Sequence, residues 1–267
     1  MWRTLARYSR LYWEYLVQYA KVRWEYRGDL IVGLVSEVTY QAMSVVLIAV
    51  TFQLVPDLRG WTRAEVFFLY GYFLVPGALF GALAGGLWDV ADKYVIKGEM
   101  DRVLIRPAHP LFQVILEGVE LESLLGVATG IAIMAWAGER AGVVWDWADW
   151  LVAVGLILSS AAVYLGIYMA LAATAFFADG RTGLMALAWN LNQYGQYPPN
   201  IFSRSLRWLL STALPFLFVG AYPGAYLVRR GEWGLFAWLT PVVAAATVAF
   251  ALWVWRRGLR RYTGAGS

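Results

Sequence analysis

Few ionisable side chains interrupt the apolar runs of this sequence, so those that do are the first candidates for chemistry. Glu37 lies eight residues inside the apolar run 29–55, and Glu117 and Glu120 stand near the start of another run. A carboxylate inside a membrane-spanning helix is costly, and for that reason it usually has a function. We therefore take these three glutamates as candidates for a substrate path.

The same residues also allow a purely structural interpretation. Glu117 and Glu120 are three positions apart and share one helical face, where they would attract a cationic or amphipathic substrate at the inner leaflet. They would equally well pair with Lys97 or Arg106, and we expect this pairing. Amides gather in a later apolar run, where they line a polar path or only join helices: Asn190, Asn192, Gln193 and Gln196.

Several kinds of chemistry are missing from the chain. There is no Cys, and the single His109 stands beside Pro110 in a polar link. The sequence has no G-x-x-x-x-G-K-[ST] loop to hold nucleotide phosphates. We therefore expect no catalytic, metal or cofactor site, and a protein that is a channel, a gradient-driven transporter or the membrane half of a powered machine.

The composition indicates a polytopic membrane protein. Of 267 residues, 60% are hydrophobic and 15% charged, with mean hydropathy +0.55. Soluble domains have about 25% charged residues, so water would not cover this chain. The net charge of +4 suits positive-inside topology better than nucleic-acid binding, and we expect lipid but no nucleic acid as a partner.

Periodicity and length predict an all-α fold with six transmembrane helices and both termini in the cytoplasm. About two thirds of the Lys and Arg then lie inside, as the positive-inside rule requires. Prolines interrupt residues 198–228, so we expect re-entrant helices there that do not cross. The predicted spans are 29–55, 66–87, 111–137, 150–177, 182–197 and 235–255.

The first 28 residues have a different pattern. Polar residues recur every three or four positions opposite an apolar stripe, and Trp2, Trp13 and Trp24 are spaced along the segment. Such a helix lies in the headgroup plane. We therefore predict an amphipathic helix over 1–28 and a transmembrane domain over 29–267.

Small residues in the second span predict close helix packing. Gly77, Gly81 and Gly85 are four residues apart and form one ridge without side chains. Such ridges let membrane helices approach closely.

The link 88–110 is the most charged part of the interior of the chain. Gly98 breaks the descending helix, carboxylates at Glu99 and Asp101 begin a short new helix, and Pro107 ends it. Met100, Val103 and Leu104 would form an apolar patch on this helix. The segment suits a rigid rod that a soluble motor pushes; an ordinary solvated loop is the alternative.

The run IKGEMDRVLIRPAHPLFQ resembles the cytoplasmic signature of ABC-2-type permeases, in particular a branch of bacterial exporters of similar length. The ending WRRGLRRYTGAGS and the proline-rich YPPNIFSRSLRWLLSTALPFLFVGAYPGAYL resemble the same branch. The resemblance implies a bacterial inner-membrane permease that dimerises with itself or a related permease. Each copy would bind a cytoplasmic ATPase subunit, which would carry the ATP and Mg.

The resemblance also assigns roles to segments. The link 88–110 would be the coupling helix, residues 1–28 a connecting helix, and 198–228 would close the exit from outside. The coupling residues would be Lys97, Gly98, Glu99, Met100, Asp101, Arg102, Leu104, Arg106 and Pro107.

A gradient-driven transporter or channel is the alternative class, and a structural membrane scaffold is a weaker third. Gradient-driven transporters commonly contain inverted repeats. The sequence has no clear second copy of the GEMDRVLIRP link or of the glycine ridge. We therefore favour the exporter permease.

Overall fold

The computed structural model describes residues 27–178, 182–229 and 231–264, and five separate helical positions before them: Glu14, Val17, Gln18, Lys21 and Glu25. Within these residues the regular secondary structure is helical, apart from one isolated β-bridge between Leu58 and Trp61. The predicted helix 1–28 lies mostly outside the described residues. The five positions named are all exposed.

Four helical stretches of the described chain are long and apolar enough to cross a membrane. Two stand alone, α2 (Arg27–Leu54) and α12 (Gly234–Leu259). The third begins with α3 (Arg63–Ala84) and continues through a 3₁₀ turn (Gly85–Asp89) into a π-helix (Val90–Ile96). The fourth joins α7 (Trp147–Ala173) to α8 (Ala175–Ala178). These four overlap the predicted first, second, fourth and last spans.

The expectation of one continuous helix over 111–137 is wrong. The chain forms α5 (Pro110–Leu116), then a break with a 3₁₀ turn at Leu121–Ser123, and then α6 (Leu124–Arg140). At the break the backbone of Gly118 lies directly against that of Gly86, in the 3₁₀ turn after α3. The helix thus gives way where two chain segments meet at glycines, and Glu117 and Glu120 lie in the break instead of in a span.

The predicted fifth span is also shorter than expected. Helix α9 covers only Leu184–Asn192, and a 3₁₀ turn follows at Gln193–Gln196. Nine residues extend about 13 Å at 1.5 Å per residue, against a hydrocarbon core of about 30 Å. By length alone, α9 does not cross.

The proline-rich segment is broken, as expected. It contains 3₁₀ turns at Pro199–Ile201 and Phe216–Phe218, with α10 (Arg204–Thr212) and α11 (Ala221–Arg229) beside them. The chain bends by 76° between Arg204–Thr212 and Phe216–Arg229, which makes this pair a broken span or a re-entrant loop. Pro215 lies in the bend.

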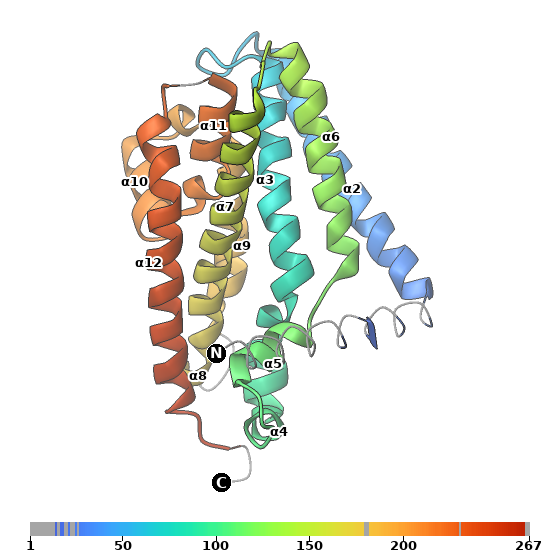
Figure 1. Cartoon of the computed structure of the whole chain (residues 1–267), viewed down its shortest axis with the longest axis vertical. Coiled ribbons are helices and arrows are strands. Elements are labelled where there is room, and N and C mark those ends of the chain that lie inside the picture. The colour runs from blue at the N-terminus through green and yellow to red at the C-terminus, as the bar shows by residue number, and fades with distance from the viewer. Residues whose placement is uncertain are drawn as a thin grey trace.

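The long helices run along the long axis of the molecule, and α3 lies between α6 and α7 (Figure 1). Helix α12 packs along α7. The short helices α4 (Met100–Leu104) and α5 lie at one end, with the C-terminal end of α12, while α10 and α11 lie toward the other end (Figure 1). The link 88–110 and the end of the last helix therefore share one end of the molecule.

Glycines set the distance between α3 and its neighbours. A Cβ on Gly71 would lie 2.8 Å from the Gly130 carbonyl oxygen of α6, and one on Gly81 would lie 2.6 Å from Ser123 Oγ. One on Gly85 would meet the Gly118 carbonyl oxygen, whereas Gly77 is at an ordinary 3.7 Å from Tyr164. Gly71 of α3 and Gly130 of α6 thus pack directly against each other, outside the predicted ridge.

We predict that Gly71→Ala destabilises the protein by about 1–3 kcal/mol, because the methyl group would press on α6 backbone atoms that have no room to move. Gly155→Ala in α7 is the matched control, since a Cβ there has nothing within 4 Å. It should stabilise slightly through better helix propensity. Thermal unfolding in detergent measures both, and equal melting temperatures for the two variants would contradict this packing.

Candidate functional site

A cavity of about 620 Å³ lies among α2, α3, α7, α9, the start of the link at Trp88 and the break between α5 and α6. Five of the seven polar residues considered for a substrate path line it: Glu37, Glu120, Asn190, Asn192 and Gln193. They come from three separate parts of the chain, and the fold brings them together. Glu117 is not among the lining residues.

Hydrogen bonds orient Glu37 from within its own helix. Gln41 Nε2 donates to Glu37 Oε1 at 2.7 Å, and Gln41 Oε1 accepts from Thr129 Oγ1 of α6 at 2.6 Å. This chain of polar groups connects α2 to α6 at the level of the cavity. The Glu37 carboxylate is therefore held in place although α2 has few buried residues.

The amides of α9 differ in their surroundings. Asn190 Nδ2 donates to the Ala186 carbonyl of its own helix at 3.1 Å. Asn192 is only 1% exposed, and its Nδ2 donates to Tyr164 Oη at 2.7 Å. Its Oδ1 is buried without a hydrogen-bond partner among the described residues. A buried acceptor without a donor is costly, so Asn192 is a candidate to bind a ligand in the cavity.

Aromatic rings form much of the cavity wall. Tyr40 of α2 and Trp189 of α9 have centroids 6.2 Å apart, and Trp189 meets Trp88 edge to face at 5.6 Å. Phe80 and Tyr164 lie 4.9 Å apart on another side. The cavity is therefore lined by rings with carboxylates and amides between them.

The link does not present the predicted apolar patch. Met100 is 0% and Val103 2% exposed, so both face the protein interior. The large apolar side chains of the link that are exposed are Ile96, at 53%, Leu104, at 46%, and Ile105, at 85%. The expectation that Met100, Val103 and Leu104 form one outward patch is wrong. Met100 and Val103 pack into the protein and anchor the short helix α4 instead.

Other residues of the link form the turn at Gly98 and the charged surface that the sequence predicts. Gly98 has φ +72°, which favours glycine, and it turns the chain into α4. The polar residues Lys97, Asp101, Arg102 and Arg106 are exposed. Charged side chains thus surround the protruding Leu104 and Ile105.

Glu117 holds the link together. Its carboxylate accepts hydrogen bonds from Lys93 at 3.0 Å, Tyr94 at 2.8 Å and Arg106 at 2.9 Å. The expected ion pair of Glu117 with Arg106 is present. The second ion pair of Glu117 is with Lys93 and not with Lys97. Gln113 Nε2 also donates to the carbonyls of Val103 and Ala108, at 3.0 and 2.9 Å. The π-helix, α4 and α5 are therefore joined through two side chains.

These contacts shift the pKa of Glu117. Burial raises it, but the hydrogen bonds from Lys93, Tyr94 and Arg106 and the charge of Lys93 outweigh burial and lower the pKa below its ordinary value. The carboxylate is thus ionised at neutral pH, as the ion pairs require.

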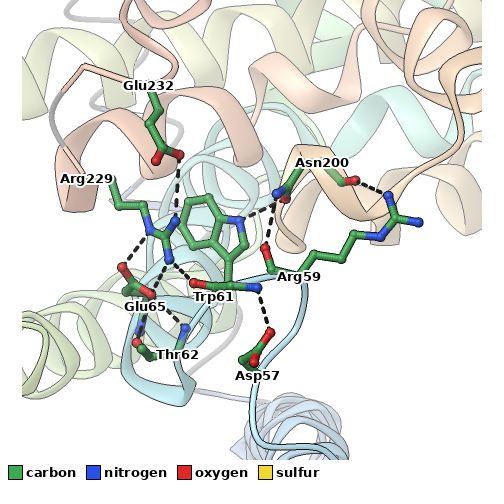
Figure 2. Close-up of polar contacts among 9 residues, drawn as sticks. Asp57, Arg59, Trp61, Thr62, Glu65, Asn200, Arg229 and Glu232 are labelled. Atoms are coloured by element: carbon green, nitrogen blue, oxygen red, sulfur yellow. Dashed lines mark hydrogen bonds and ion pairs between the residues drawn. The ribbon is translucent and has the colours of Figure 1, made fainter.

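A second polar cluster, which the sequence did not indicate, lies at the opposite end. Arg229 at the end of α11 forms a two-point ion pair with Glu65, at 2.6 and 2.7 Å, and its guanidinium stands over the Trp61 ring (Figure 2). Trp61 Nε1 in turn donates to Asn200 Oδ1 at 2.8 Å. The α2–α3 loop, the start of α3 and the proline-rich segment are thereby tied to one another.

The fold and these sites define a helical membrane protein with an internal cavity and a protruding link. A family model described as "ABC-2 family transporter protein" matches residues 38–266, and the chain belongs to this family. Neither a curated protein nor a solved structure matches the chain. The chain is therefore a membrane transport component of the ABC-2 type, and the matched range includes the link and every cavity-lining residue except Glu37.

We predict that Glu117→Gln destabilises the protein at neutral pH by about 1 kcal/mol, a value discounted because Arg106 is partly exposed to solvent. The folded-state pKa of Glu117 is lowered, so its contribution is present above the unfolded-state pKa and disappears as the pH falls through the folded-state value.

Melting temperatures from neutral to acidic pH measure this effect. The gap between wild type and Glu117→Gln should close in acid, while Glu139→Gln at the other end should follow the wild type throughout. A gap that stays constant down to the lowest pH would contradict the ionised contact.

Proposed function

We propose that the chain is the membrane-spanning permease subunit of an ATP-driven ABC-2-type exporter in the bacterial inner membrane. The observation that carries this proposal is the protruding Leu104–Ile105 tip on a link fixed to the transmembrane helices. The link would lie in the cytoplasm with both termini. In this arrangement α6 and the segment 184–201, in which α9 is extended by the 3₁₀ turns that follow it, complete six crossings, while α10 and α11 lie on the outer side.

The chemistry of the tip supports a soluble partner there. Ile105 is 85% exposed, and charged side chains flank it on both sides. Large apolar side chains rimmed by charges are typical of protein contact sites. Because Glu117 and Gln113 fix the base of the tip, a push on it would move the attached helices instead of bending the link.

The energy source would belong to the partner. The sequence has no phosphate-binding loop, so ATP and Mg are expected on a cytoplasmic ATPase subunit. The coupling residues would be those of the link from Lys97 to Pro107, with Met100 as an internal anchor and Ile105 added as a contact.

A second permease copy or a related permease would complete the passage. Helix α2 is apolar but exposes most of its length, including Ile31, Val32 and Val35 at 58, 65 and 59%. In the assembly this face would contact the second permease or lipid. The cavity beside α2 would hold the substrate before export.

The test is the ATPase activity that co-purifies with the tagged chain. The double variant Leu104→Asp and Ile105→Asp puts two charges into the proposed contact, and the recovered activity should fall by about tenfold or more. Val144→Asp is the matched control, because Val144 is 82% exposed in the loop at the other end.

Equal activity in both variants would contradict the proposed contact. Proton-driven flux through the purified chain alone would favour a gradient-driven transporter instead.

A further inference from the structure

We propose that the cavity beside α2 binds an organic cation that carries N–H donors and an apolar body, such as a protonated amine. This inference rests on the proposed function only for its role in transport, since binding itself needs no ATPase. Charge, hydrogen-bonding capacity and wall chemistry each support this class of ligand.

The charged side chains among the described residues that line the cavity are both acidic. Glu37 and Glu120 contribute carboxylates from α2 and from the break between α5 and α6. No Lys, Arg or His is among the described residues that line it. Anionic ligands would meet repulsion here, whereas a cation would be attracted on entering a region of lower dielectric constant.

An unsatisfied hydrogen-bond acceptor in the cavity wall also favours a ligand with N–H donors. Asn192 Oδ1 is an acceptor that is buried and lacks a partner among the described residues, while its Nδ2 is already used by Tyr164. Asn192 Oδ1 can therefore accept a hydrogen bond from a ligand. A ligand N–H group would satisfy Asn192 Oδ1, and a carbonyl or ether oxygen would not.

The walls suit the rest of such a molecule. Trp88, Trp189 and Tyr40 form a run of rings in contact with one another. Faces of Trp and Tyr attract cations as well as apolar groups. The volume of about 620 Å³ is in the range of small-molecule sites, about 300–1,000 Å³.

The binding experiment uses dansylcadaverine, a fluorescent primary amine that is protonated at neutral pH, and its uncharged N-acetyl derivative. The purified chain is placed in phosphatidylcholine nanodiscs without any ATPase. We expect the amine to bind and the acetylated form to bind at least about tenfold more weakly, as the loss of one good charged contact implies. The double variant Glu37→Gln and Glu120→Gln should weaken amine binding to a similar degree, while Glu139→Gln should bind like wild type.

A second comparison isolates Asn192. The trimethylammonium analogue of the same probe keeps the charge but has no N–H on its cationic nitrogen. Asn192→Ala should therefore weaken the primary amine more than the trimethylammonium probe. Melting temperatures of all variants separate lost binding from lost folding, and the ratio between the two probes is independent of the folded fraction.

The outcomes separate the two proposals. Equal binding of the amine and its acetylated form, or unchanged binding in the Glu37 and Glu120 double variant, overturns the inference even if an ATPase co-purifies. Selective binding of the amine supports it even if no ATPase does.

Discussion

The Glu117 carboxylate is the contact on which the organisation of the link depends. It binds side chains from the π-helix and from the end of α4, and it sits at the end of α5. Without it, three short elements joined at Gly98 and Pro107 would have no common polar anchor. With it, the exposed Leu104 and Ile105 have a rigid base, which is what transmission of force through so short a segment requires.

The same constraint connects the tip to the cavity. Trp88 lies two residues before the π-helix, and Glu120 lies three residues after Glu117. Both Trp88 and Glu120 line the cavity. A displacement of the link as one body would therefore move two of the cavity walls. At the other end, Arg229 and Glu65 hold α3 to α11, so α3 is restrained where it is farthest from the link.

Features governed by local hydropathy could be predicted from the sequence, and those governed by contacts between distant segments could not. The apolar runs predicted α2, α3, α7 and α12, and the prolines predicted the broken segment. The break before α6 depends on Gly118 meeting Gly86, and the orientation of Met100 on the packing beneath α4. Polar residues in apolar runs did indicate five cavity residues, whereas the ion pair of Arg229 with Glu65 joins positions far apart in the sequence and could not be predicted from it.

The most direct measurement of the central claim is the sidedness of the tip. The chain has no Cys, so Ile105→Cys and Val144→Cys each give one reactive site for a membrane-impermeant maleimide. The account predicts that position 105 is labelled only from the cytoplasmic side, that a bound ATPase subunit protects it, and that position 144 is labelled only from outside. Labelling of position 105 from outside, or equal labelling with and without the ATPase, would contradict it.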